Sequence, residues 1–190
     1  MLDTPLVAPS EYFNRTDAFS LQRAVGLALA YWLGSVAVAI LWRVTGDFDL
    51  APVTVSFVLQ TLEATLLYWV VPTVVLYGLG YVIGASGEPA DALTLAAWGL
   101  VPLLAGQVVS NLLLYALVLL EADSTGSPAG TDIWLFVPLT LLACGWAAYI
   151  WRGGLQADFD LDRSTATATA LLAAAICAGL LLVPILPSVA

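Results

Sequence analysis

The sequence predicts an all-α integral membrane protein, a bundle of about five transmembrane helices with a short N-terminal interfacial segment. Of the 190 residues, 61% are hydrophobic and only 10% are charged, whereas soluble domains carry roughly 25% charged residues. The mean hydropathy is +0.96. The apolar residues form five long runs separated by polar loops, and a run of ~20 apolar residues can cross a bilayer.

The first element is a polar entry, residues 1–23. Tyr12 and Phe13 lie close to Arg15 in this stretch. A short helix with aromatic and charged side chains can lie in the membrane interface with its rings dipped inward. We therefore expect these three residues to form a cytoplasmic, interfacial anchor. A disordered tail is the alternative.

The transmembrane domain follows over residues 24–187. Its predicted spans are residues 24–42, 64–83, 92–120, 133–151 and 167–186. The second apolar run starts already at Val53, which is earlier than one crossing requires. We place the crossing after Glu63 because a carboxylate is costly in hydrocarbon. Pro72 lies within this run and is expected to kink the helix.

Arginine sets the predicted orientation, because acidic residues contribute little to the positive-inside rule. With five spans, four of the five arginines share the side of the N-terminus, namely Arg15, Arg23, Arg152 and Arg163. Arg43 alone lies on the other side. We therefore expect a multi-pass protein of the cell membrane with a cytoplasmic N-terminus and an external C-terminus.

The charge balance excludes several classes of partner. The chain has 14 acidic residues, five arginines and no histidine, giving a net charge of −9. Nucleic-acid binding needs a basic surface, and zinc sites commonly need histidine. We expect no nucleic acid, metal or cofactor. Acidic loops without lysine resemble those of proteins from a very salty cytoplasm, so we expect a halophilic source.

Small residues recur at fourfold spacing in several spans, and such pairs let helices approach closely in lipid. The pairs are Gly80 with Gly84, Ala143 with Ala147, and Ala175 with Gly179. Packing inside the bundle and contact with a partner helix are both open at this point.

Glu63 is a functional-site hypothesis because carboxylates in or near hydrocarbon are expensive. Gln60 lies one turn before it on the same helix face. Gln107 and Asn111 share a face of the third span, which runs in the opposite direction, and residue counting puts Glu63 and Asn111 at similar depth. We expect these four residues to form a polar intramembrane cluster for a proton, an ion or a lipid headgroup. Interhelical hydrogen bonds averaging ~0.6 kcal/mol are the alternative.

Catalytic motifs are incomplete, so we predict that the chain is not an enzyme. Residues 84–87 read Gly-Ala-Ser-Gly, as in an intramembrane serine protease, but the chain has no histidine to act as base. Residues 158–162 begin like a calcium loop, but Arg163 occupies the position of the required glycine.

Three short motifs occur in a characteristic order. They are Pro9-x-x-Tyr12-Phe13, the corner Gly84-Ala-Ser-Gly87, and Ala96-Ala97-Trp98-Gly99-Leu100-Val101-Pro102 in the third span. This order resembles the Yip domain family of Ypt/Rab-interacting membrane proteins, and the resemblance covers most of the chain. In that family an entry of the same form precedes five spans, and a glycine corner precedes a helix with an aromatic residue, a small residue and proline. The family's topology, with the N-terminus inside and the C-terminus outside, agrees with the arginine count.

The resemblance implies a non-enzymatic membrane scaffold or adaptor that acts through protein–protein or protein–lipid contacts in the bilayer. Eukaryotic members resemble adaptors that bind prenylated small GTPases and one another. Their long N-terminal region is nearly absent here, so GTPase binding is not carried over to this chain. The expected partners are membrane lipids and the chain itself or another membrane protein. The alternative is a small transporter or lipid-handling protein that uses the polar cluster around Glu63.

Overall fold

The computed structural model describes residues 4–14, 18–45, 53–121 and 131–183, and this part of the chain is helical, without strands. The elements are α1 (Pro9–Phe13), α2 (Leu21–Thr45), α3 (Val55–Val82), α4 (Pro89–Glu121), α5 (Thr131–Ala157) and α6 (Arg163–Leu182). Five of these helices are long and apolar enough to cross a membrane. The predicted all-α, multi-pass membrane fold is therefore confirmed.

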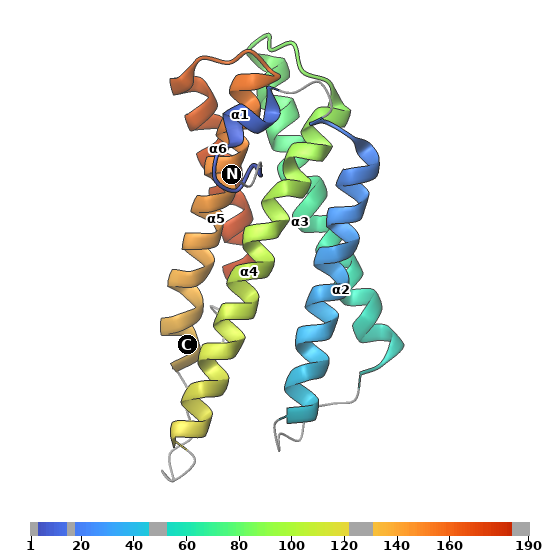
Figure 1. Ribbon diagram of the computed structural model, residues 1–190, viewed down its shortest axis with the longest axis vertical. Coiled ribbons are helices and arrows are strands. Elements are labelled where there is room, and N and C mark those ends of the chain that lie inside the picture. Colours follow the sequence, from blue (N-terminus) through green and yellow to red (C-terminus); the bar gives the residue numbers. More distant parts are fainter. Residues whose placement is uncertain (1–3, 15–17, 46–52, 122–130, 184–190) are drawn as a thin grey trace.

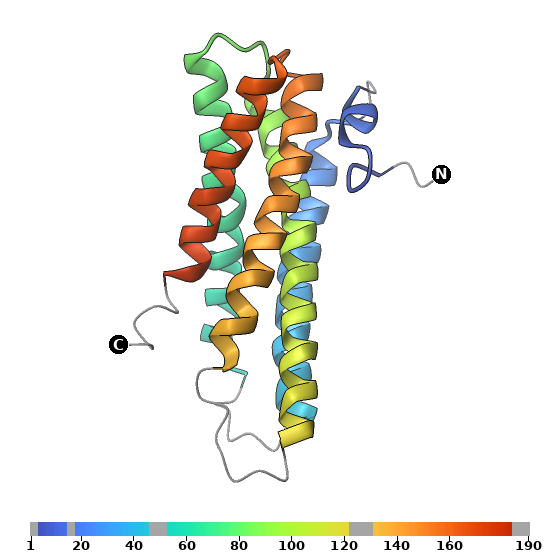
Figure 2. The ribbon, with the colours of Figure 1, turned by 90° about the vertical axis from the view of Figure 1, so that its left-hand side faces the viewer.

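The five long helices run side by side, and the short helix α1 lies against the flank of the bundle near one end (Figures 1 and 2). The connections from α3 to α4 and from α5 to α6 lie at this same end. We call it the α1 end. It is the end that the arginine distribution predicts to face the cytoplasm.

Side chains and turns fix several helix boundaries. The hydroxyl of Thr54 accepts a hydrogen bond from the backbone N–H of Phe57 at the start of α3. The carboxylate of Asp162 accepts from the N–H groups of Ser164 and Thr165 at the start of α6. These caps satisfy backbone groups that would otherwise lack a partner at a helix start.

Helix α3 ends in a glycine turn. Gly84 has φ +79°, a conformation that glycine adopts without steric cost. Its N–H donates to the carbonyl of Tyr81, and the N–H of Ala85 donates to the carbonyl of Gly80. These two bonds form a Schellman motif, which satisfies the last carbonyls of the helix. α3 passes through Pro72 as one continuous helix.

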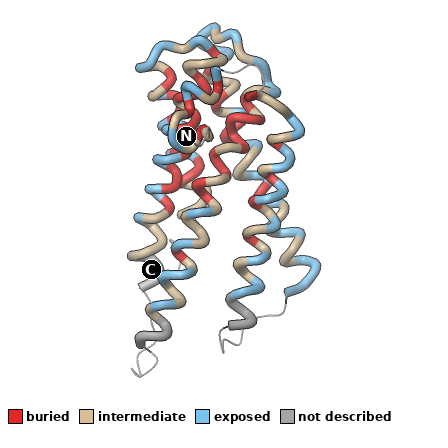
Figure 3. Tube along the Cα trace, viewed as in Figure 1, coloured by how far each residue is buried: buried red, intermediate tan, exposed pale blue. Residues whose placement is uncertain are grey.

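The core is concentrated near the α1 end, where buried residues are most frequent along the trace (Figure 3). Large side chains pack there directly onto glycines of neighbouring segments. A Cβ atom at Gly99 would lie 2.4 Å from the ring of Trp151, and one at Gly154 would lie 2.3 Å from Leu95. These close approaches hold α4 against α5.

Phe159, in the turn between α5 and α6, is 1% exposed and packs into the corner between α3 and α4. A Cβ atom at Gly87 would lie 2.4 Å from its ring, and one at Gly80 would lie 3.2 Å away. The glycine corner is therefore shaped around an aromatic ring from the other connection at this end.

Candidate functional site

The N-terminal segment is held against α5 by hydrogen bonds to its own backbone. The indole N–H of Trp146 donates to the carbonyl of Leu6 at 3.0 Å, and the hydroxyl of Tyr149 donates to the carbonyl of Val7 at 2.9 Å. Pro9 lies against Gly153, where a Cβ atom would come within 2.6 Å of the proline ring. Gly153 thus gives the segment room to dock.

The aromatic residues of the segment point into the protein. Phe13 is 3% exposed, and the ring of Tyr12 meets that of Trp98 edge to face at a centroid distance of 5.5 Å. Nη1 of Arg23 donates to the hydroxyl of Tyr12 at 2.8 Å. These rings therefore pack on the bundle itself, and the location of the segment in the membrane interface stays a prediction. Arg15 lies outside the described residues.

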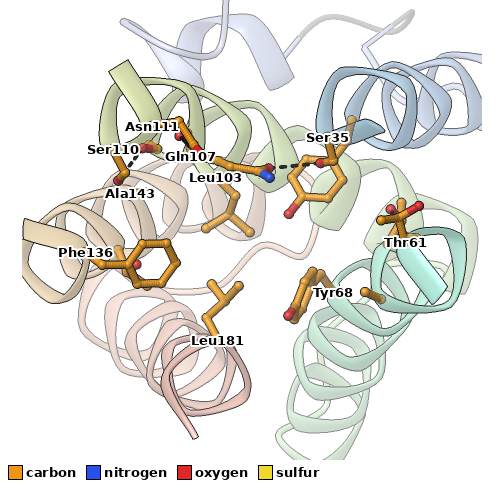
Figure 4. Close-up of a pocket in the computed structure, with 15 residues that line it drawn as sticks. Ser35, Thr61, Tyr68, Leu103, Gln107, Ser110, Asn111, Phe136, Ala143 and Leu181 are labelled. Carbon is orange, nitrogen blue, oxygen red and sulfur yellow. Dashed lines mark hydrogen bonds between the residues drawn. The ribbon is translucent and has the colours of Figure 1, made fainter. Parts of the chain in front are cut away.

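The middle of the bundle contains a cavity of about 350 Å³ (Figure 4). All five long helices contribute to its lining, which combines apolar residues with hydroxyl and amide side chains. Its polar lining residues are Tyr31, Ser35, Thr61, Thr65, Tyr68, Gln107, Ser110, Asn111 and Thr140. Most of the lining surface is apolar, and neither a carboxylate nor a guanidinium is among its described residues, so the described lining is uncharged and carries a few polar groups.

Hydrogen bonds orient these polar groups. The hydroxyl of Ser35 donates to Oε1 of Gln107 at 2.9 Å and so connects α2 with α4. The side chains of Thr65, Ser110 and Asn111 donate to carbonyls one turn earlier in their own helices. Because their hydrogens are engaged in this way, the oxygen lone pairs of Thr65 and Ser110 remain for a guest molecule that donates hydrogen bonds.

The structure separates the predicted polar cluster into two pairs. Gln107 and Asn111 line the cavity, but Gln60 and Glu63 lie exposed on the outer face of α3, beside a shallow groove formed by α3 alone. The expectation that Glu63 would meet Asn111 is therefore corrected. The face of α3 that lines the cavity carries hydroxyl groups at positions 61, 65 and 68, a helical spacing that the sequence could have revealed.

The three small-residue pairs occupy different environments. Ala143 and Ala147 are buried, and a Cβ atom at Gly106 of α4 would lie 3.0 Å from Ala143, so this pair serves packing between α4 and α5. Gly80 packs on Phe159 and Gly84 forms the turn at the end of α3, as described above. The remaining pair, Ala175 and Gly179, lies on α6: Ala175 is exposed, and a Cβ atom at Gly179 would have no neighbour within 4 Å.

Three carboxylates gather at the α1 end, a grouping that the sequence did not indicate. Burial first, and then the negative charge of Asp91, raises the pKa of Asp158 to about 6, with a smaller effect from Glu88. Oδ2 of Asp158 is buried and has no hydrogen-bond donor among the described residues. The described residues include no group of three or more side chains arranged to hold a metal ion.

Among models of protein families, that of the Yip1 domain matches residues 5–184, nearly the whole chain. Comparison with curated proteins found no match, and comparison with solved structures found none either. The matched range includes α1 and all five long helices.

Proposed function

Because the chain belongs to the Yip1 domain family, we propose that it is a non-enzymatic membrane scaffold or adaptor acting through protein–protein or protein–lipid contacts in the bilayer. The Yip1 family is not a known enzyme family. The five apolar helices support a multi-pass membrane protein, and family membership supports membrane proteins as the class of partner.

The observation that carries this proposal is the uncovered pair of small residues on α6. Ala175 and Gly179 lie four residues apart; Ala175 is exposed, Gly179 is half-buried, and a Cβ atom at Gly179 would meet no atom of the described residues within 4 Å. The neighbouring Leu171 and Leu172 are 56% and 48% exposed. In lipid, a small residue at every fourth position lets a second helix pack closely. We propose that α6 receives a helix of a second copy or of another membrane protein.

The rigid α1 end supports a role in holding partners. The N-terminal segment is tied to α5 by two side-chain hydrogen bonds, and aromatic rings pack on glycines across three helices. Close-packed protein interiors have low compressibility. The outer faces of the bundle are therefore presented in a fixed arrangement.

Purification from native membranes in mild detergent tests the proposal, with co-purifying proteins and lipids identified by mass spectrometry. Ala175→Leu combined with Gly179→Leu should remove the partner, or convert an oligomer to the monomer, because two bulky side chains prevent close approach. Gly26→Leu is the matched control, since a Cβ atom at Gly26 also has no neighbour within 4 Å. A partner retained by the double variant, or lost equally in the control, would rule out the α6 face.

A second candidate function, transport or lipid handling, is favoured by the central cavity. The cavity is uncharged, so its guest would be a neutral molecule with hydroxyl or amide groups. Asn111→Leu and Thr65→Val should then lower flux or binding, whereas Glu63→Gln should leave both unchanged because Glu63 lies outside the cavity. Loss of flux in the Glu63→Gln protein alone would instead restore a role for that carboxylate.

A further inference from the structure

Arg152 is a partly buried cation that has no counter-charge in the described part of the protein. It lies in α5, close to the α1 end of the candidate span Leu135–Ala157. Its Nε atom is buried and lacks a hydrogen-bond partner among the described residues, and the side chain forms no ion pair. Buried polar groups nearly always have a partner, so this unpartnered Nε atom is unusual within the described part of the protein.

The carboxylates nearest in sequence are engaged elsewhere or exposed. Asp162 caps α6 through the backbone N–H groups of Ser164 and Thr165. Asp158 interacts with Asp91, and Asp160 is exposed. In a chain with 14 acidic residues, an arginine without an acidic partner leaves a local positive charge.

Arg152 lines a groove of about 180 Å³ between α5 and α6. Thr167 of α6 and Tyr149 of α5 also line the groove, with Tyr149 one helical turn farther from the α1 end than Arg152, and the guanidinium lies 5.3 Å from the centre of the Tyr149 ring. Farther from the α1 end, the groove is lined by Leu171 and Gly145. The groove is therefore polar near the membrane surface and apolar toward the bilayer centre, as a phospholipid is.

We propose that this groove binds an anionic phospholipid, with Arg152 contacting the phosphate and an acyl chain lying along Leu171. A guanidinium can donate two parallel hydrogen bonds to a phosphate. Cavities for whole small molecules measure roughly 300–1,000 Å³, so this smaller groove suits part of a headgroup whose remainder stays in the bilayer. Leu171 also borders the α6 face proposed above for a partner helix, but Arg152 lies on α5 and not on that face, so the Arg152 variants below test the lipid site separately.

Native mass spectrometry of the full chain in mild detergent tests the proposal, using phosphatidylglycerol and phosphatidylcholine with matched acyl chains. The unaltered protein should retain phosphatidylglycerol preferentially. Arg152→Gln should reduce this preference about fivefold, the effect of roughly one interfacial charge on an anionic lipid. Arg163→Gln is the matched control, because Arg163 is exposed at the same end, and it should keep the preference. Equal retention of both lipids by the unaltered protein would overturn the proposal, as would equal losses in the two variants.

A second variant, Arg152→Lys, tests the guanidinium contact without the loss of charge that could misfold the glutamine variant. A competition experiment distinguishes a lipid phosphate from a free phosphate ion. Arg152→Lys keeps the charge and the aliphatic stem, and it should bind phosphatidylglycerol at least twofold more weakly because an ammonium lacks the planar fork. Unchanged retention in this variant would contradict the guanidinium contact. Inorganic phosphate should fail to displace the lipid; displacement at equal concentration would overturn the lipid assignment in favour of a soluble anion.

Discussion

The ring of Trp151 occupies the space that a side chain at Gly99 would need, because a Cβ atom there would lie 2.4 Å from ring atom Cζ2. Trp151 is 1% exposed and cannot swing aside into solvent or lipid. Gly99 belongs to the aromatic-small-proline motif of the sequence, and this contact gives the motif a physical reason: the glycine lets α4 and α5 close around the indole.

Gly99→Ala should therefore destabilise the bundle by about 1–3 kcal/mol, the usual cost of overpacking a core. Unfolding of the purified protein in detergent, followed by circular dichroism, measures the change. Gly26→Ala is the control because its Cβ would meet no neighbour within 4 Å, and it should be neutral or slightly stabilising. Similar effects of both substitutions would mean that helix propensity, rather than the Trp151 contact, governs position 99.

Gly153→Val should displace the N-terminal segment from α5, because any Cβ at this position collides with Pro9. Hydrogen exchange of the amides in residues 10–14 should become faster, while exchange in the long helices changes little. Gly145→Val places the same side chain on α5 where no neighbour lies within 4 Å, and it should leave this exchange unchanged. If exchange is the same in both variants, the segment does not depend on Gly153 for docking.

The α1 end should be more stable in mildly acidic solution than at neutral pH. Burial first, and then the charge of Asp91, raises the pKa of Asp158 from 3.8 to about 6. The folded protein thus binds the proton more tightly than the unfolded chain. This stabilisation is fully present below pH 3.8 and is lost as the pH rises through 6.

The size of this pH effect should be about 1 kcal/mol, because solvent reaches the carboxyl and screens its neighbours. Unfolding midpoints at pH 5 and pH 7.5 measure it. Asp158→Asn should abolish the difference that this residue causes, whereas Asp160→Asn should preserve it, since Asp160 is exposed. A pH dependence that survives in Asp158→Asn would assign the effect to other groups.

The hydrogen bond between Ser35 and Gln107 should contribute about 0.6 kcal/mol to stability, the average for such bonds in membrane proteins. A double-mutant cycle with Ser35→Ala and Gln107→Leu isolates this coupling from other effects of the substitutions. Glu63→Gln should cost less than either single change, because Glu63 is exposed. A coupling energy near zero would show that the bond adds nothing to the link between α2 and α4.

The predicted orientation is tested by thiol labelling in intact cells. Ser86 is exposed in the corner between α3 and α4, whereas position 124 falls outside the described residues. A cysteine at position 124 should react with an impermeant probe from outside, and one at position 86 only after permeabilisation. Cys144 and Cys177 are buried and should add little background. The reverse labelling pattern would invert the topology.

The long helices were predictable because hydropathy alone marks segments that can cross a bilayer. Which face each helix turns inward was not, since apolar residues surround every span and leave no polar face as a guide. Glu63 illustrates the difficulty: its depth was estimated from residue counts, but it lies two residues from both Thr61 and Thr65, so about 200° around α3 separates it from these cavity-lining residues.

Contacts between segments far apart in the sequence could not be predicted from the sequence either. Phe159 follows an aspartate in an acidic loop, and nothing in its neighbourhood indicates that it packs on Gly87, 72 residues earlier in the numbering. The N-terminal segment is equally rich in aromatic residues whether its rings enter lipid or pack on the protein. Its composition therefore could not distinguish the two placements. The motifs behind the family resemblance were visible in the sequence, but their meeting at the α1 end required the fold.

The hydrogen bonds from Trp146 and Tyr149 to the N-terminal segment span sequence separations of 140 and 142 residues. Ribosomes add roughly 5–20 residues per second, so the segment waits at least about seven seconds after its own synthesis before its binding surface on α5 exists. Until then its aromatic rings can meet Arg23 and Trp98, which are made earlier, but the carbonyls of Leu6 and Val7 lack their two donors. Its docking marks the point at which the fourth membrane helix has been made and put in place.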